Sequence, residues 1–276
     1  MFGKLLKHEF KATSRIIPFI YLALIFFTAI ACISYKLKMN GLISLSVLFM
    51  VLVGIAAIII TLVTCIMRFH KSMFGNEGYL SNTLPVKKSE LLATKTITSF
   101  VWYILSFLIW FMCFFLFLSL VSNDLYSQIL SILPFSVLIQ FIAVIGGMLL
   151  LQSIYFIAQI YFCITLSNTK KFQQKGVAMG FVFYIAIYII NSIISGLLEM
   201  YVPLGIKLTP NGVALTFESM IDTVKAAGSS VNTTTSTFFE LSNLSFGICN
   251  IGFELLATIA LFWIITKLLN KKTSVR

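Results

Sequence analysis

Six long apolar runs, separated by short polar stretches, constrain the fold of this chain more than any other feature. About 20 consecutive apolar residues are needed for an α-helix to cross the hydrocarbon core of a bilayer. The runs that reach this length are residues 16–35, 42–67, 93–121, 132–166, 176–199 and 245–266. The chain is 59% hydrophobic and 11% charged, which leaves too little polar side chain to cover a water-soluble domain of 276 residues. The sequence therefore predicts an all-α, polytopic integral membrane protein in which six transmembrane helices form one domain.

The positions of the basic residues predict the orientation of these helices. With the N-terminus in the cytoplasm, six spans return the C-terminus to the same side. All of the 20 Lys and Arg residues then lie on the cytoplasmic side except Lys36, Lys38, Lys207 and Lys225. Because an excess of Lys and Arg marks cytoplasmic loops, the pattern predicts an N-in, C-in topology. The net charge of +11 is explained by this topology, and nucleic acid is not predicted as a partner.

The first 15 residues, which precede the first span, have an amphipathic pattern. Apolar residues recur at helical spacing and basic residues occupy the other face, namely Phe2, Leu5, Leu6 and Phe10 against Lys4, Lys7, His8 and Lys11. This pattern is typical of a helix that lies in the membrane interface. The alternative is a basic tail that only enforces the orientation of the protein.

The longest polar interruption in the first half is the cytoplasmic loop at residues 68–92, between the second and third spans. It mixes charged residues with a small apolar set, and Pro85 breaks it. The apolar members are Phe74, Tyr79, Leu80, Leu84 and Val86. A solvated spacer would not need apolar side chains, so we predict a short helix that lies against another surface. Ser89 is positioned to cap the third span, with Glu90 in its first turn.

Two of the predicted spans carry a patterned face. On the second span a stripe of small residues predicts close packing of another helix, formed by Gly54, Ala57, Thr61 and Thr64. On the fifth span one face combines glycines with polar side chains, namely Gly176, Gly180, Tyr184, Tyr188, Asn191 and Ser195. Unpaired polar groups are costly in lipid, so the polar part of this face is expected either to pack on a neighbouring helix or to line a translocation path.

The sixth span contains Glu254, with Asn250 and Thr258 at four-residue spacing on either side. A carboxylate inside a membrane span is by default a candidate for function. A neutral, hydrogen-bonded structural glutamate is the alternative interpretation. Together with the fifth-span residues, Asn250 and Glu254 are the candidates for a translocation path or for dimer packing.

One long external segment, at residues 200–244, separates the fifth and sixth spans. Proline and glycine residues break it near its start, and residues 215–227 have the pattern of a short amphipathic helix. The sequence thus predicts an external helical segment followed by a loop rich in Ser, Thr and Asn.

Residue patterns for catalysis and cofactor binding are missing from the sequence. No phosphate-binding loop of P-loop spacing occurs, and His8 and His70 are isolated from other ligand residues. The five Cys residues form no CxxC pair, so neither a disulfide framework nor a zinc site is indicated. We therefore predict no enzymatic activity, no catalytic or metal site and no cofactor bound by this chain.

These features together resemble the permease subunits of type-2 ATP-binding cassette (ABC) exporters. The most specific match is the stretch from Phe74 to Lys95, FGNEGYLSNTLPVKKSELLATK, which is similar to the bacterial Glu-Gly-Tyr-Leu…Leu-Pro-Val…Lys loop of such permeases. The stretch from Lys4 to Lys11, KLLKHEFK, resembles their N-terminal connecting helix. The resemblance covers the whole chain in topology and these two stretches in residue detail.

The resemblance implies an ATPase-coupling helix near Glu77 to Leu84, formed by Glu77, Gly78, Tyr79, Leu80, Leu84 and Pro85. It would dock on a separate nucleotide-binding subunit, which would hold ATP and Mg²⁺. Glu77 would contact that subunit, or else would only cap the helix, while the apolar residues would fill a notch. Two identical or homologous permeases would form a twelve-span exporter in the bacterial cytoplasmic membrane. The resemblance does not specify the substrate: we expect an amphipathic or hydrophobic molecule, such as an antimicrobial peptide, a drug or a lipid, and ions are also compatible with apolar helices that carry a few Tyr, Asn and Gln residues.

Two other functions are compatible with the sequence. One is a non-transporting assembly factor or sensor in the membrane, whose loop binds a different cytosolic partner. The other is an ion-coupled secondary carrier that uses Glu254. Many carriers contain an internal repeat, and no repeat is visible between the two three-span halves of this chain.

Overall fold

Six long apolar helices dominate the computed structural model, which describes residues 2–75, 77–78, 86–121, 135–169, 172, 176–209, 212–217, 219, 221, 245–247 and 249–271. The helices are α2 (Ile17–Lys36), α3 (Asn40–Met73), α5 (Lys88–Val121), α7 (Phe135–Ser167), α8 (Gly176–Tyr201) and α10 (Cys249–Lys271). Each contains a stretch long and apolar enough to cross a membrane. The prediction of a largely helical protein with six such helices is confirmed.

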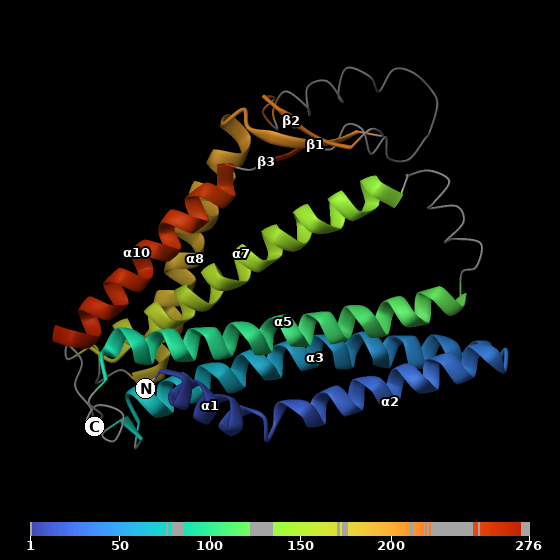
Figure 1. The fold of residues 1–276 in the computed structure, drawn as a ribbon, viewed down its shortest axis with the longest axis horizontal. Helices are drawn as coiled ribbons and strands as arrows, with labels where there is room; N and C mark the ends of the chain where they lie inside the picture. Colours follow the sequence, from blue (N-terminus) through green and yellow to red (C-terminus); the bar gives the residue numbers. More distant parts are fainter. Residues whose placement is uncertain are drawn as a thin grey trace.

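A shorter helix, α1 (Phe2–Thr13), precedes them, so the helix predicted over the first 15 residues is present. It lies beside the C-terminal part of α3 and the N-terminal part of α5 (Figure 1). We call this end of the molecule the α1 end; α7 and α10 also finish there. The face of α1 that carries Glu9 and Thr13 is buried.

Helix α5 is the centre of the bundle, because it packs against α1, α2, α3, α7 and α10. Its contact with α3 uses the predicted stripe of small residues. A Cβ atom on Gly54 would lie 2.0 Å from the indole ring of Trp110, so a larger residue there requires Trp110 to move. Ala57 and Thr61 are also fully packed. Close helix packing at this stripe is confirmed for these three residues, whereas Thr64 faces a groove beside α8.

The helices form two groups (Figure 1). Helices α2, α3 and α5 run side by side, while α7, α8 and α10 diverge from them away from the α1 end. A cluster of buried side chains from α3, α5, α7 and α10 joins the groups at the α1 end. Its members include Phe69, Met73, Phe74, Leu91, Leu92, Ile157, Tyr161, Ile265 and Leu269.

Helix α3 is longer than a bilayer requires. Its 34 residues correspond to about 50 Å, against a hydrocarbon core of about 30 Å. The predicted loop at 68–92 is therefore shorter than expected, because α3 continues to Met73 and α5 already begins at Lys88. The last turns of α3 place Arg68, Lys71 and Ser72 on a helix instead of a loop.

The predicted external segment is not purely helical: the part that the structure describes contains strands, although Ile221, inside the helix expected at 215–227, is helical. Three antiparallel strands occur there in the order β2-β1-β3: β1 (Gly205–Thr209), β2 (Gly212–Thr216) and β3 (Ser245–Gly247). Strand β2 takes the first two residues of the helix expected at 215–227, most of which lies outside the described residues. Strand β3 occupies 245–247, so the sixth apolar helix begins at Cys249 and not at 245.

The hairpin has a local cause. Thr209 pairs with Gly212, which leaves two residues, Pro210 and Asn211, between the strands. An Asn-Gly step between apolar, β-branched segments is a strong hairpin signal. The Pro210-Asn211-Gly212 step, which we read as a break in the external segment, connects two paired strands.

Candidate functional site at the α1 end

A network of ion pairs connects α1, α3 and α5 at the α1 end. Lys95 Nζ lies 2.6 Å from Glu9 Oε1, and Arg68 Nε lies 3.2 Å from Glu9 Oε2. Lys95 also donates a hydrogen bond of 2.5 Å to Ser72 Oγ. Each oxygen of the Glu9 carboxylate therefore has its own cationic partner, contributed by a different helix.

The Glu9–Lys95 pair is buried. The side chain of Lys95 is 3% exposed and that of Glu9 is 11% exposed. Burial by itself would raise the pKa of Glu9, but the neighbouring Lys95 and Arg68 outweigh it and lower this pKa below its ordinary value. Glu9 is thus held as a carboxylate. Removing one member of such a pair leaves a buried charge without its partner, which is expensive.

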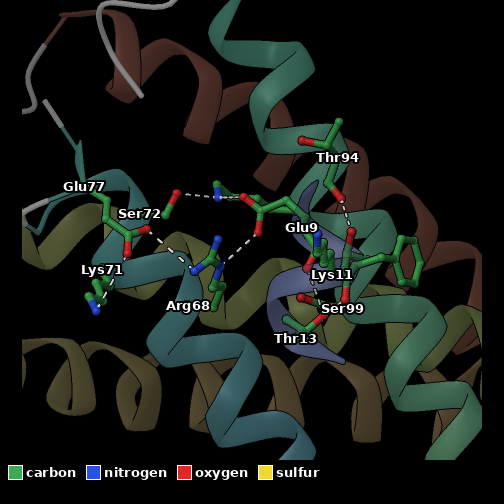
Figure 2. A network of polar contacts seen from close by, with 12 residues as sticks. Glu9, Lys11, Thr13, Arg68, Lys71, Ser72, Glu77, Thr94 and Ser99 are labelled. Carbon is green, nitrogen blue, oxygen red and sulfur yellow. Dashed lines mark hydrogen bonds and ion pairs between the residues drawn. The ribbon is translucent and has the colours of Figure 1, made fainter. Parts of the chain in front are cut away.

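Arg68 extends the network to the loop that follows α3. Its Nη1 atom lies 3.7 Å from Glu77 Oε2, and Lys71 Nζ lies 3.7 Å from Glu77 Oε1. Figure 2 shows Glu9 and Glu77 on opposite sides of Arg68. Glu77 is 39% exposed, so its own pairs contribute little to stability. These pairs instead fix the position of the start of the loop, because they attach Glu77 to the last turns of α3.

The structure describes two of the six residues predicted for ATPase coupling. Glu77 lies in the network, and the N–H of Gly78 donates a 2.8 Å hydrogen bond to the carbonyl of Gly75. The other four, Tyr79, Leu80, Leu84 and Pro85, lie outside the described residues.

Further polar contacts follow one face of α5 from Lys95 onward. Ser99 bonds the Tyr161 hydroxyl at 2.6 Å, and the Trp102 indole N–H donates to Thr13 Oγ1 at 2.7 Å. One turn later Ser106 bonds the hydroxyls of Tyr21 and Thr61, at 2.6 and 2.9 Å. Residues 95, 99, 102 and 106 are three or four positions apart and so share a face. This face attaches α1, α2, α3 and α7 to α5 by hydrogen bonds.

A second polar cluster lies within the apolar helices α7, α8 and α10. Gln159 donates a 2.7 Å hydrogen bond to the Tyr155 hydroxyl, and Tyr155 also interacts with Asn191 and, electrostatically, with Glu254. Asn191 and Glu254 lie on α8 and α10, which pack against each other and against α7. Glu254 is 7% exposed, so this face of α10 is turned toward protein.

The other residues of the predicted path are more dispersed. Tyr184 stacks on Tyr188, with ring centroids 6.2 Å apart, but Tyr188 is 57% exposed. The Ser195 hydroxyl and the Asn250 carbonyl oxygen are buried, and within the described part of the chain they have no hydrogen-bond partner. The polar face of α8 therefore packs on α7 along part of its length and leaves Tyr188 uncovered.

Sequence reasoning missed the ion pairs that Lys95 and Arg68 form with Glu9, and the hydrogen bond from Lys95 to Ser72. We interpreted the positive charges of Arg68 and Lys95 as markers of topology. A usable signal was present, because Lys95 lies inside the predicted span 93–121 and a lysine there needs a counter-ion. Glu9 is the single acidic residue among the first 15.

No known protein family, curated protein or solved structure matches the chain. Among the residues that the structure describes, no group of three or more His, Cys, Asp or Glu side chains is arranged to hold a metal ion.

Proposed function

We propose that this chain is the membrane-spanning permease subunit of an ATP-driven exporter of the type-2 ABC class. One observation supports it most: Glu77, at the start of the predicted coupling loop, is connected through Arg68 to the buried Glu9–Lys95 pair. A solvent-exposed loop on an inert membrane protein would not need such an attachment. A loop that transmits force from a docked subunit would.

The geometry gives the loop a mechanical path into the membrane. Phe74, directly after α3, is 5% exposed and belongs to the cluster that joins α3, α5, α7 and α10. In the proposal, a nucleotide-binding subunit binds residues 77–85 on the cytoplasmic side. Its ATP-driven movement shifts the ends of α3 and α5, and so biases a two-state dimer of permeases. An amphipathic or hydrophobic substrate then passes between the two permeases, which are identical or homologous.

Charge reversal at Glu77 tests this proposal. We expect Glu77→Lys to reduce ATP-dependent export by about tenfold, because the loop loses both of its pairs to α3 and a contact on the motor subunit is disrupted, a loss near 1.4 kcal/mol. Membrane insertion should be unchanged, since Glu77 is partly exposed. The measurement is export and substrate-stimulated ATP hydrolysis by the permease co-purified with its ATPase.

Glu90→Lys is the matched control for that experiment. It makes the same charge change in the first turn of α5, beyond the loop. Equal export in Glu77→Lys and wild type would contradict the proposal. So would failure of any P-loop ATPase to associate with the chain, which would favour the assembly-factor or sensor alternative.

The ion-coupled carrier is a second candidate, favoured by the burial of the Glu254 carboxyl, which is 7% exposed, within a membrane-spanning helix. Under the exporter proposal, Glu254→Gln should keep at least about half of ATP-dependent export, because a neutral glutamine preserves the packing of α10. Transport in proteoliposomes with ATP, or with a pH gradient alone, separates the two functions. Gradient-driven transport that is lost in Glu254→Gln and retained in Glu199→Gln would establish the carrier.

A further inference from the structure

A groove of about 710 Å³ lies between α3 and the pair α7 and α8, and the last turn of α1 closes part of it. Its lining is mostly apolar side chain, including Leu62, Phe156 and Ile160. Its size is in the range of pockets that hold small organic ligands. Met67 and Phe181, also in the lining, are 65% and 66% exposed, so the groove is open along one side.

The basic residues of the groove are concentrated at one end. Arg68, His70 and Lys71 belong to the lining and sit on the last turns of α3, whereas the opposite end begins at Leu62. Lys71 lies nine positions after Leu62 on the helix, about 13 Å along the axis. Half of the hydrocarbon core of a bilayer is about 15 Å. The groove therefore has the length of one leaflet, with basic side chains at the end where head groups lie.

We propose that this groove binds a single anionic phospholipid of the leaflet at the α1 end. Its acyl chain lies against the apolar lining, and its phosphate lies beside Lys71 and Arg68. The ion-pair network at this end has a net positive charge, which favours an anion. It contains three cationic side chains, Arg68, Lys71 and Lys95, and two carboxylates, Glu9 and Glu77, so its net charge is +1 without His70. Lys71 is 66% exposed and lies 3.7 Å from Glu77, so a phosphate can approach its ammonium without breaking a buried pair.

A lipid is favoured over a helix of a second copy by the same charges. A second copy would have to present an acidic group to Arg68 and Lys71. At the α1 end, Glu9 and Glu77 are already paired within their own chain, and Glu90, in the first turn of α5, is outside the groove lining. The proposal also has a consequence for the loop, since the lipid phosphate and Glu77 would share Arg68 and Lys71. It does not depend on transport, so it can fail or succeed independently of the exporter proposal.

Native mass spectrometry of the full-length chain in detergent tests the inference. The probes are phosphatidylglycerol and phosphatidylcholine with identical acyl chains. We expect one phosphatidylglycerol to bind about fivefold more tightly than phosphatidylcholine, and Lys71→Gln to remove about this factor, because one basic side chain near an anionic surface contributes on this order. Lys4→Gln is the matched control, since it removes the same charge from an exposed position of α1 outside the groove lining; its effect should be less than about twofold.

A second measurement locates the acyl chain. In Met67→Trp, the introduced indole should be quenched by phosphatidylglycerol brominated on its acyl chains, beyond the quenching of wild type, and not by soluble glycerol phosphate. Equal affinity for the two lipids would overturn the proposal, as would equal losses in Lys71→Gln and Lys4→Gln. Competition by glycerol phosphate would indicate an anion site without a lipid. Loss of lipid binding on dimerisation would assign the groove to a second copy.

Discussion

Glu9→Leu should lower the free energy of unfolding by about 3–5 kcal/mol, the largest loss that we expect from a single charged residue. The substitution leaves the ammonium of Lys95, which is 3% exposed, with the Ser72 hydroxyl and no carboxylate. A buried charge without its counter-ion is penalised by desolvation, and here the substitution also removes one of the contacts that hold α1 on α5, which leaves the Thr13–Trp102 hydrogen bond. Unfolding in mixed micelles with increasing denaturant, followed by circular dichroism, measures the effect.

A double-mutant cycle separates the pair from its surroundings. Lys95→Met alone should cost less than Glu9→Leu, because Glu9 keeps Arg68 at 3.2 Å. The double variant Glu9→Leu/Lys95→Met should recover most of the stability, since apolar replacement of a whole buried pair is often neutral. Glu77→Gln, at the exposed end of the network, should cost less than about 1 kcal/mol. A loss below 1 kcal/mol in Glu9→Leu would show that the pair does not hold α1 in place.

The same pair gives a defined pH dependence. The pKa of Glu9 in the folded protein lies below its ordinary value near 4.5. Its contribution is therefore fully present above that value, and it is lost as the pH falls through the lowered pKa of the folded state. The stability difference between wild type and Glu9→Leu should therefore shrink as the pH falls from 6 into the acid range.

The sequence was sufficient to predict the six apolar helices, because hydropathy alone decides whether a segment of 20 residues prefers lipid to water. It also predicted the close approach of α5 to the stripe that contains Gly54, since small residues permit such packing whatever the partner. The sequence did not identify the residue that packs on this stripe. The ring against Gly54 belongs to Trp110, more than 50 positions later in the chain. Local patterns determine local structure, and pairings between distant helices require the fold.

The ion pairs at the α1 end show the same limit more clearly. Glu9 and Lys95 are 86 positions apart, and each is explained by a local reading, one as part of an amphipathic helix and the other as a topology marker. The pair becomes evident only in the structure, where both side chains are buried and in contact. The hairpin at β1 and β2 was a different kind of error, because its Asn-Gly signal was local and was read only as a break before a helix.

Tyr161→Ala should lower the free energy of unfolding by about 3–5 kcal/mol, the range found when a buried aromatic residue is truncated. Tyr161 is 2% exposed, and its ring stacks on that of Phe69 with centroids 3.9 Å apart. This contact joins α7 to α3, and the hydroxyl bond to Ser99 joins α7 to α5. Thermal unfolding of the purified variant, in the same detergent as wild type, gives the loss.

Tyr161→Phe separates the two contributions, because it keeps the stacked ring and removes the hydroxyl. It should cost about 1–2 kcal/mol, from the lost hydrogen bond and the unsatisfied Ser99 hydroxyl. If the cavity in Tyr161→Ala loosens α3 from α7, the loop after α3 loses the support of the cluster that contains Phe74. Limited proteolysis should then cleave residues 74–87 faster in Tyr161→Ala than in Tyr161→Phe. Equal cleavage in the two variants would show that the loop is held by its ion pairs alone.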